Sequence, residues 1–527
     1  MFAGQVEVLD KTEISGWVAP VGEDTGPIRV SLHVDGKEVA GTWAAALVER
    51  SAPNARKFRL GISDVWSFLK SIDQLTVHAG ETELPIATRT EAATASPSSK
   101  YPTRDIFSKI GKGFVFNQFG RFRLSKKVDY KWQKEVTGLY DRLAATVGSI
   151  LGYEMFLCYG TMLGYVREKG IIGHDVDFDC AYISRHSDGR AAAAEIKQLA
   201  LGLIEAAYDV TCKKSCLEIS DPRANGVSID LFHLYFDEAD ELAFPFGVAG
   251  TSTLKKSDLR IEQREFLGER VAVPVPEEAF VEHVYGEHWR VPNPGFNWRL
   301  DRTKRARAGL IGGPAVNEVY WANFYAHASY KTASSFFEFV AKRPDTPPNI
   351  FEVGCGDGRD AISFGTGGRR VLGIDRSTVG IDHANEKSER ARLADKVRFT
   401  TVDVSDTTSL RAAFERAQEA AGSGPVMIYT RFFLHSITED VQHAMMTSLS
   451  SDMRPGDMFA AEFRTDKDEH QKHVHGDDHY RRYQNAAEFS RRLAQDYGLR
   501  VLYEHEGIDL SPYKGENPVL CRVIAQR

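Results

Sequence analysis

The sequence predicts three folded parts: an N-terminal antiparallel β-sandwich, an α+β middle domain and a C-terminal doubly wound α/β domain. Its 527 residues exceed one ordinary domain and fit three of the usual size. Short apolar runs separated by turns open the chain, and strand-like and helix-like segments alternate at its end. The expected boundaries are 1–88 for the sandwich, 89–103 for a linker, 104–311 for the middle domain and 312–527 for the last domain.

Composition narrows the classes of function. The formal net charge of −7 is small, which argues against nucleic-acid binding as the main activity. The six cysteines are scattered, and Cys212 and Cys216 lack the second pair that would complete a zinc site. The first residues do not resemble a secretory signal, and no apolar run reaches the roughly 18 residues that span a membrane. We therefore expect a cytoplasmic protein without a transmembrane segment.

The first part of the chain contains turn-separated runs of strand length. These runs are 6–9, 14–18, 28–34, 58–62 and 75–77. Asp35-Gly36 stands between two apolar runs and indicates a β-hairpin. No catalytic residue types cluster here, so we expect an interaction or assembly module. The following stretch is rich in Ala, Ser, Thr and Pro, as is typical of a linker.

The middle part mixes helical and strand patterns. Apolar residues recur at helical spacing over 130–151, and a second helix is expected near 191–208. Strands are expected at 155–159, 177–182 and 227–236. This mixture predicts an α+β domain.

Three aspartates of the middle part have the spacing of a metal site. Asp177 and Asp179 alternate along a predicted strand, so both carboxylates should project from one face. Asp230 lies on another predicted strand that can neighbour the first. Mg²⁺ prefers such oxygen ligands and often shares them with phosphates. The alternative is a set of surface carboxylates at a strand edge.

Groups suited to phosphate lie just upstream. Gly160 and Thr161 precede a helix and offer backbone N–H groups and a hydroxyl, and Arg167 adds a positive charge. Their presence beside the aspartates favours a site over isolated surface carboxylates.

The C-terminal part opens with a glycine-rich turn after a strand. Glu352 is followed by Gly354, Gly356 and Gly358, which allow a tight turn and a close approach of ligand to backbone. Asp375 ends the next strand, about 20 residues later, where an acidic side chain can accept ribose hydroxyls.

A third strand is expected to end at Asp403, where an adenine amino group can bind. A bound NAD competes as an interpretation because the topology is shared. The E-x-G-x-G-x-G form and the missing glycine at dinucleotide spacing disfavour it.

These residues resemble the class I S-adenosylmethionine-dependent methyltransferases over about 200 residues. The resemblance implies that Glu352 and the glycine loop hold the methionine part of S-adenosylmethionine, that Asp375 holds its ribose, and that Asp403 holds its adenine. The segment before the loop is similar to the amino-terminal lid of such enzymes, with Phe324 and Tyr325 near the cofactor.

The methyl acceptor is expected at the carboxyl edge of the sheet. Arg431 and His435 follow the fourth strand, and Tyr480, Arg481 and Arg482 follow a histidine-rich stretch. Arginines grip phosphate or carboxylate in pairs of hydrogen bonds, so we expect an anionic acceptor. If the acceptor is a sugar hydroxyl, His435 is the candidate general base.

Two other interpretations of the histidine-rich stretch remain open. In one its histidines form a metal site, and in the other the segment is a solvated polar helix. The histidines concerned are His470, His473, His475 and His479.

The middle part resembles the LicD and fukutin-related family over about 153–235, with a similar closing segment at 285–298. The resemblance implies a nucleotidyltransferase-like fold and the transfer of phosphorylated groups from CDP-linked donors to glycans. Asp177 and Asp179 would bind Mg²⁺, and Asp230 would be a third ligand or the base for the acceptor hydroxyl. Gly160, Thr161 and Arg167 would contact the donor phosphates. The family commonly has an acidic residue where Val176 stands, which leaves the number of metal ions open.

Together these features suggest a bifunctional enzyme of surface-polysaccharide synthesis, associated at most peripherally with glycan-assembly machinery. The middle domain would transfer a phosphate-linked group from a CDP-type donor to a glycan, and the last domain would methylate the product. In one alternative the middle domain makes the activated CDP donor from CTP. In another it is an inactive glycan-binding scaffold for the methyltransferase.

Overall fold

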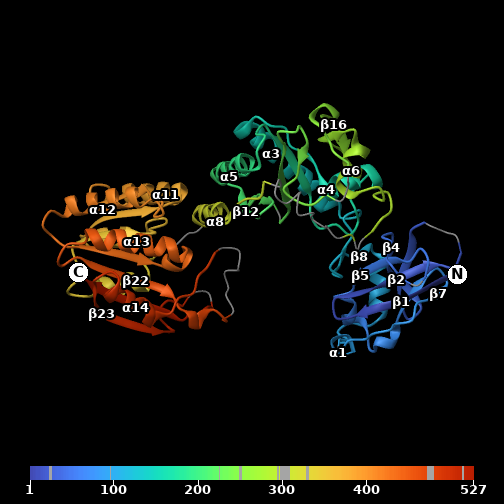
Figure 1. Ribbon diagram of the computed structural model, residues 1–527, viewed down its shortest axis with the longest axis horizontal. Coiled ribbons are helices and arrows are strands. Elements are labelled where there is room, and N and C mark those ends of the chain that lie inside the picture. The colour runs from blue at the N-terminus through green and yellow to red at the C-terminus, as the bar shows by residue number, and fades with distance from the viewer. Residues whose placement is uncertain are drawn as a thin grey trace. The chain divides into compact units, whose positions relative to one another are not determined.

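The computed structural model describes the chain apart from a few segments, and it divides into two compact units (Figure 1). The first unit comprises Met1–Leu199 and Lys213–Ile311, and the second comprises Ala200–Cys212 and Gly312–Arg527. The segments not described are 23–25, 51, 95, 225, 249–251, 294–295, 297–308, 328–331, 472–479 and 513–514.

The N-terminal module, residues 1–124, contains two antiparallel sheets whose residues share one hydrophobic core. One sheet has the order β1-β2-β5 and the other the order β4-β3-β6-β7. The strands are β1 (Phe2–Leu9), β2 (Glu13–Pro20), β3 (Ile28–Val34), β4 (Lys37–Ala44), β5 (Arg56–Gly61), β6 (Leu75–Ala79) and β7 (Thr82–Glu83), with 3₁₀ turns η1 (Val65–Phe68) and η2 (Ile72–Gln74). The predicted hairpin joins β3 to β4, and Asp35 and Gly36 both have positive φ.

Residues beyond 88 also belong to this core. Ile106 and Phe122 are buried in it, and the backbone N–H of Tyr101 donates to the carbonyl of Ser67 at 2.9 Å. The segment expected as a linker, 89–103, is therefore hydrogen-bonded to the module. The elements concerned are α1 (Glu91–Thr94), α2 (Arg104–Gly111), β8 (Phe114–Phe116) and β9 (Phe122–Leu124).

The turn between β8 and β9 is seated tightly on β5. A Cβ atom at Gly120 would lie 2.2 Å from the backbone nitrogen of Ile62. We expect Gly120→Ala to lower the free energy of unfolding by more than about 1 kcal/mol, because both the clash and the positive φ oppose it. Gly36→Ala is the matched control, since Gly36 has the same φ of +71° and no atom within 4 Å of the added carbon. Urea unfolding of the full chain measures both, and equal losses would show that strain at positive φ, and not the contact, is responsible.

In the middle region, β10, β11, β14 and β13 are successive neighbours in a mixed sheet, and β15 also pairs with β14. β11 and β14 run parallel, and the other neighbouring pairs run antiparallel. The elements are α3 (Tyr130–Leu151), β10 (Phe156–Leu157), α4 (Tyr159–Leu163), η3 (Gly164–Glu168), β11 (Asp179–Ser184), α5 (Gly189–Glu205), β12 (Asp209–Cys212), β13 (Cys216–Ser220), β14 (Ser228–Phe236), β15 (Leu242–Ala243), η4 (Lys256–Asp258), β16 (Arg260–Phe266), β17 (Glu269–Val275) and α6 (Glu277–Tyr285). The helix predicted over 130–151 is confirmed, and β11 begins two residues later than predicted.

The second unit is a doubly wound α/β domain, as the alternation of elements predicts. Its sheet has the order β20-β19-β18-β21-β22-β24-β23, in which only β24 runs antiparallel to its neighbours. The strands are β18 (Asn349–Val353), β19 (Arg370–Asp375), β20 (Val397–Thr401), β21 (Val426–Arg431), β22 (Met458–Arg464), β23 (Arg500–Gly507) and β24 (Leu520–Gln526).

Helices cover both faces of this sheet and form two separate cores (Figure 1). α12, α13 and α14 contribute to one core, and α9, α10 and α11 contribute to the other. The helices are α8 (Gly313–His327), α9 (Ser335–Ala341), α10 (Arg359–Thr366), α11 (Thr378–Arg390), α12 (Thr407–Ala421), α13 (Glu439–Asp452) and α14 (Ala486–Gln495), with 3₁₀ turns η5 (Leu434–Ser436) and η6 (Asp466–Asp468).

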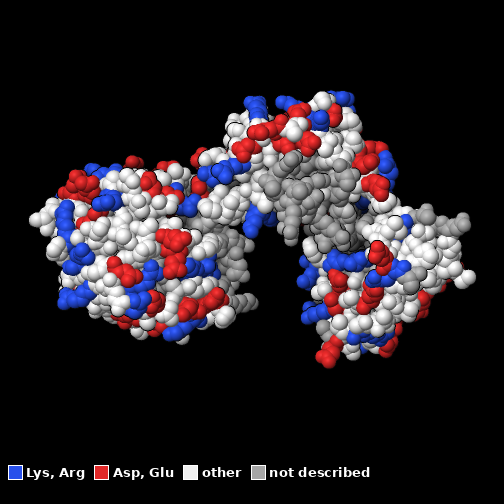
Figure 2. All heavy atoms as spheres, viewed as in Figure 1, with Lys and Arg blue, Asp and Glu red and all other residues white. Residues whose placement is uncertain are grey.

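The surface accords with the small net charge. Figure 2 shows acidic and basic side chains interspersed over the described parts of the face it draws. Among the helices that the structure describes, none has the length and apolar character needed to cross a membrane.

Candidate active sites

The middle region contains a cavity of about 870 Å³ lined by aspartates. Parallel pairing of β11 with β14 sets Asp179 opposite Asp230, so the two carboxylates that the sequence placed on separate strands are neighbours. Asp175 and Asp177 line the same cavity from the loop before β11. Asp177 therefore precedes the strand, and it does not share a strand face with Asp179 as the sequence predicted.

Gly160 and Thr161 hold Asp179 in place. The Gly160 N–H donates to Asp179 Oδ2 at 2.8 Å, and the Asp179 N–H donates to Thr161 Oγ1 at 2.7 Å. A Cβ atom at Gly160 would lie 2.6 Å from Asp175 Oδ2 and 3.1 Å from Asp179 Oδ2, so only glycine lets both carboxylates come this close. The sequence assigned Thr161 to phosphate. Thr161 is buried and its hydroxyl oxygen accepts the N–H of Asp179, so its contact with a phosphate stays a prediction.

Mutual repulsion and burial raise the pKa values of the carboxyl groups in the cavity. Burial, together with Asp175, Asp177 and Asp230, raises the pKa of Asp179 well above its usual range. Burial and Asp177 raise the pKa of Asp175 to about 7. Burial raises the pKa of Asp230 to about 6, although Lys213 Nζ lies 3.2 Å from its Oδ2 and opposes the shift.

A hard divalent cation fits this set of donors. One carboxylate oxygen each of Asp175 and Asp179 converges beside Gly160, and Mg²⁺ is typically held by one or two carboxylates together with water and substrate phosphates. Among the residues that the structure describes, no three His, Cys, Asp or Glu side chains are placed to hold a metal by themselves. The arrangement therefore suits a cation that a phosphorylated substrate helps to bind.

Positive charge also reaches the cavity. Arg167 lines it, and its guanidinium donates to the carbonyl of Trp289 at 3.2 Å and to Glu168 Oε1 at 3.0 Å. Burial and the nearby Arg167 lower the pKa of His174 to about 4, so this imidazole is neutral near pH 7.

Sequence reasoning missed two residues of this site. Asp175 continues the alternation of Asp177 and Asp179 by one further step, and that signal was available. Lys213 lines the cavity from the turn between β12 and β13, and nothing in its sequence surroundings pointed to Asp230.

The second unit has its own cavity, of about 480 Å³, at the end of β18. Gly354, Gly356 and Gly358 all have positive φ. A Cβ atom at Gly356 would lie 2.5 Å from the ring of Tyr325, and the Gly356 N–H donates to Asp375 Oδ2 at 2.9 Å. The glycine loop and the acidic end of β19 thus meet at the cavity, as the sequence predicted.

Glu352 offers a buried and unused acceptor in this cavity. It is 4% exposed, and its Oε2 atom has no hydrogen-bond partner among the described residues. Burial, with Asp360 and Asp357 nearby, raises its pKa well above the usual range. A ligand that brings an ammonium group would satisfy this oxygen, and the methionine part of S-adenosylmethionine carries one. The residues present therefore fit that cofactor.

Aromatic side chains of α8 close the same cavity. Tyr320, Trp321, Phe324 and Tyr325 line it, and the rings of Trp321 and Tyr325 stack with centroids 5.9 Å apart. This is the lid position expected for Phe324 and Tyr325.

Asp403 does not reach the cavity. It lies two residues beyond the end of β20, is exposed, and accepts hydrogen bonds from the N–H and hydroxyl of Ser405 at 2.9 and 2.8 Å. The strand therefore ends two residues earlier than expected, at Thr401, and the contact of Asp403 with an adenine stays a prediction.

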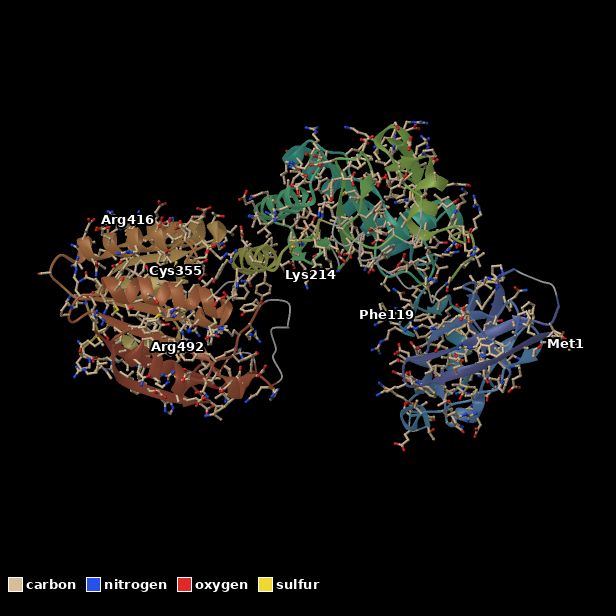
Figure 3. The ribbon with its side chains drawn as sticks, in the orientation of Figure 1. Met1, Phe119, Lys214, Cys355, Arg416 and Arg492 are labelled. Atoms are coloured by element: carbon tan, nitrogen blue, oxygen red, sulfur yellow. The ribbon has the colours of Figure 1, made fainter. Side chains whose placement is uncertain are left out.

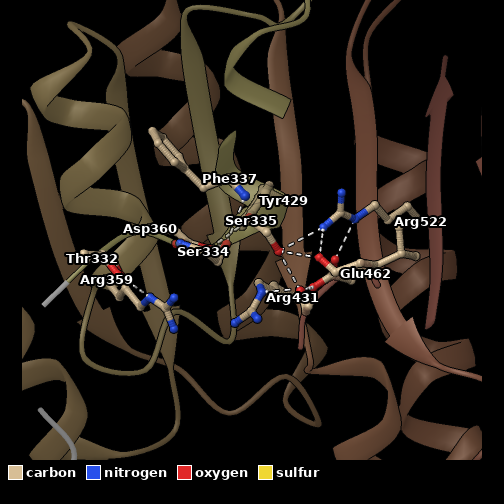
Figure 4. Close-up of polar contacts among 12 residues, drawn as sticks. Thr332, Ser334, Ser335, Phe337, Arg359, Asp360, Tyr429, Arg431, Glu462 and Arg522 are labelled. Atoms are coloured by element: carbon tan, nitrogen blue, oxygen red, sulfur yellow. Dashed lines mark hydrogen bonds and ion pairs between the residues drawn. The ribbon is translucent and has the colours of Figure 1, made fainter. Parts of the chain in front are cut away.

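Arg431 faces the cavity and is held from behind by a buried glutamate (Figure 4). Its Nε donates to Glu462 Oε1 at 3.0 Å, and Glu462 is fully buried. Arg522 Nε donates to Glu462 Oε2 at 2.7 Å, and Ser511 Oγ donates to Oε1 at 3.0 Å. Figure 4 shows the remaining nitrogens of Arg431 pointing away from Glu462.

The other residues predicted for the acceptor divide into two groups. His435 and Arg481 line the cavity. Arg482 does not, because its guanidinium donates to the carbonyls of Leu434 and Ile437, both at 3.4 Å.

Tyr480 is 44% exposed and also lies outside the lining of this cavity. Of the histidine-rich stretch, His473, His475 and His479 lie outside the described residues.

Comparison with known proteins identifies both regions. Residues 152–276 match the family model described as LicD/FKTN/FKRP, nucleotidyltransferase domain, and residues 325–504 match the model of a methyltransferase domain. A mouse protein, ribitol-5-phosphate transferase FKTN, is 29% identical over 168 residues, which are 30% of this chain. The match spans 34% of that relative's length. Both resemblances seen in the sequence are confirmed at the level of the domain.

Several solved structures, among them SAM-dependent methyltransferases, are similar to part of this chain. A structure from work on thioacetal formation in echinomycin biosynthesis is 18% identical, with a TM-score of 0.32, and covers 40% of this chain and 91% of its own. A SAM-dependent methyltransferase from Anabaena variabilis is 14% identical, with a TM-score of 0.31, and covers 40% and 93%. Magnesium protoporphyrin IX methyltransferase from Synechocystis, with bound SAM, is 14% identical, with a TM-score of 0.27, and covers 44% and 86%.

Proposed function

We propose that the LicD/FKTN family domain and the methyltransferase domain of this chain act in turn on one glycan. The first transfers a phosphate-linked group from a CDP-type donor to the glycan, and the second methylates the product with S-adenosylmethionine. The observation that carries the proposal is the pairing of Asp179 with Asp230 across two strands, with Asp175 brought against Asp179 at Gly160. Such a product would suit the capping of a surface polysaccharide.

The proposal includes the architecture. We assign the N-terminal module to an antiparallel β-sandwich, supported by its two sheets on one core. We assign the middle domain to the nucleotidyltransferase-like fold, supported by the mixed sheet and the matching family model.

In the proposed transfer, the acceptor hydroxyl attacks the donor's phosphorus in line and CMP leaves. Asp230, whose pKa lies near 6, accepts the hydroxyl proton, and Lys213 holds its carboxylate. Asp179 and Asp175, with Asp177 beside them, would hold Mg²⁺, and Arg167 would contact the donor phosphates. When bound, the cation neutralises charge on the donor's pyrophosphate.

In the proposed methylation, Glu352 accepts a hydrogen bond from the ammonium of the cofactor and Asp375 receives its ribose. When bound, S-adenosylmethionine supplies the electrophilic methyl group. Arg431 and Arg481 orient an anionic acceptor such as the newly added phosphate, whose oxygen needs positioning and no base. If a sugar hydroxyl is methylated instead, His435 accepts its proton.

A substitution at Gly160 tests the proposed transfer reaction of the middle domain. We expect Gly160→Ala to lower transfer at least about tenfold, because the new carbon must displace Asp175 or Asp179. The reaction is followed as CMP released from a CDP-linked alditol phosphate in the presence of glycan. Gly170→Ala is the control, since the nearest atom to its added carbon lies 4.0 Å away. Equal activity of both variants and the wild type would contradict the assignment.

The whole proposal is tested on surface glycan from cells that lack this chain and are rescued with single variants. Mass spectrometry should find that Asp179→Asn cells lack both the phosphorylated group and the methyl group, whereas Gly356→Arg cells lack only the methyl. Independent losses would end the serial scheme. Release of pyrophosphate from CTP by the purified chain, in place of CMP from a CDP donor, would show that the domain makes the donor instead.

A further inference from the structure

The N-terminal module forms part of the wall of the acidic cavity. Ala45, Ala46 and Gln118 line it together with the aspartates of the middle domain. The two alanines follow β4, and Gln118 lies in the turn between β8 and β9. The module therefore presents uncharged groups to a cavity that carboxylates of the middle domain also line.

This wall is held in a fixed position next to the aspartates. The backbone N–H of Lys126, which follows the module directly, donates to the carbonyl of Gly173 at 3.0 Å, two residues before Asp175. Lys127 Nζ lies 2.7 Å from Glu168 Oε2. The connection from the module is thus bonded to the segment that leads into the catalytic carboxylates.

The turn that carries Gln118 is also rigid. Asn117 Oδ1 accepts hydrogen bonds from the N–H groups of Phe119 at 3.0 Å and Arg121 at 2.9 Å, and Ser63 Oγ donates to the carbonyl of Phe119 at 2.7 Å. Phe119, labelled in Figure 3, is nevertheless 62% exposed. A fixed turn that presents an aromatic ring to solvent loses little entropy when a ligand covers that ring.

Two further features beside the cavity indicate what would cover it. Leu47, which follows Ala46 in the chain, is an apolar residue that is 65% exposed. Gln118 Oε1 is buried without a hydrogen-bond partner among the described residues. A sugar offers both matching groups, because its C–H face packs on aromatic and aliphatic side chains and its hydroxyls donate hydrogen bonds.

We propose that Ala46, Gln118 and Phe119 form a subsite for an uncharged sugar chain, namely the part of the acceptor glycan that adjoins the reacting hydroxyl. The inference rests on the proposed function in taking the acceptor to be a glycan. The chain held here is uncharged, because Ala46, Gln118 and Phe119 offer an anion no cation to pair with. The cations that line the cavity, Arg167 and Lys213, are bonded to Glu168 and Asp230. The module thereby selects the acceptor, and the middle domain binds the donor.

The test measures glycan binding apart from turnover. The probe is surface glycan isolated from cells that lack this chain, titrated calorimetrically into the full-length protein without donor. We expect Phe119→Ala to weaken binding about tenfold, a factor that corresponds to about 1.4 kcal/mol. Ala46→Trp, which fills the module side of the cavity, should weaken it at least as much. Tyr130→Ala, which removes another exposed aromatic ring, should leave binding unchanged.

The slow release of CMP from the donor to water, without glycan, should be the same in Tyr130→Ala as in the wild type, because Tyr130 lies outside the lining of the cavity. Wild-type affinity in both Phe119→Ala and Ala46→Trp would overturn the subsite, and so would a wild-type protein that binds no glycan. If the wild type binds glycan, the variants lose that binding, and no phosphorylated group is ever transferred, the subsite stands and the proposed function fails.

Discussion

Replacing Asp175 with asparagine should lower phosphate-group transfer by about 10³-fold, which corresponds to about 4 kcal/mol in the activation free energy. The amide has nearly the same shape as the carboxylate and carries no charge. It therefore leaves the packing at Gly160 intact and removes one of the two oxygens that converge there. Methylation of a preformed phosphorylated glycan should be unaffected, because it takes place in the other unit. CMP release, measured at several Mg²⁺ concentrations, should show the loss.

The same Asp175→Asn variant should not lose folding stability. This result would separate a catalytic role of Asp175 from a structural one. The pKa of Asp175 in the folded chain lies near 7, above its usual value of 3.8, so the unfolded chain gives up this proton more easily. As pH rises from about 3.8 to about 7, the unfolded chain loses this proton before the folded chain does. The free energy of unfolding of the metal-free wild type therefore falls over that pH interval. Asp175→Asn escapes this cost and should be at least as stable at about pH 8 as the wild type.

The outcome for Asp73→Asn, which removes an exposed carboxylate of the N-terminal module, should be wild-type transfer and wild-type stability. An Asp175→Asn variant that retains transfer would place the cation elsewhere, on Asp177 and Asp230. A variant that loses transfer and unfolds more easily would show that Asp175 is structural.

The alternation of apolar strands and helices in the sequence predicted those parts of the two sites that lie at strand ends or on paired strands. The glycine loop with Glu352 and Asp375 lies where the alternation of strands placed it, since the carboxyl ends of parallel strands meet at one edge. The pairing of Asp230 with Asp179 was also foreseeable, because each aspartate lies near the start of an apolar β-type run and the two runs pair in parallel. These features depend on period and order alone.

The structure differs from the sequence-based expectations where a polar side chain can bond to several alternative partners. Thr161 and Arg482 carry the groups expected of phosphate ligands, and yet Thr161 bonds to Asp179 and Arg482 to carbonyls near η5. Which partner a hydroxyl or guanidinium takes depends on the tertiary neighbours that no spacing rule describes. The role of Gln118 was invisible for the same reason, since its turn meets the cavity only after the module has folded.

Glu462→Gln should destabilise the second unit by about 3 kcal/mol and also reduce methyl transfer. Glu462 is fully buried and pairs with both Arg431 and Arg522, so neutralising it leaves two largely buried guanidiniums without their counter-charge (Figure 4). Urea unfolding, followed by circular dichroism, measures the first effect. Methylation of a phosphorylated glycan measures the second.

Arg431→Gln is the matched variant. It should separate the effect of Arg431 on methyl transfer from the effect of the ion pairs on folding stability. Arg522 and Ser511 still bond to Glu462 in that variant, so the loss of stability should be much smaller, while methyl transfer should fall at least as far because the charge that faces the cavity is gone. If the loss appears as a weaker affinity for S-adenosylmethionine, Arg431 binds the carboxylate of the cofactor. If it appears as a higher KM for the phosphorylated glycan, Arg431 binds the acceptor. Unchanged methyl transfer in Arg431→Gln would show instead that the arginine serves only to neutralise Glu462.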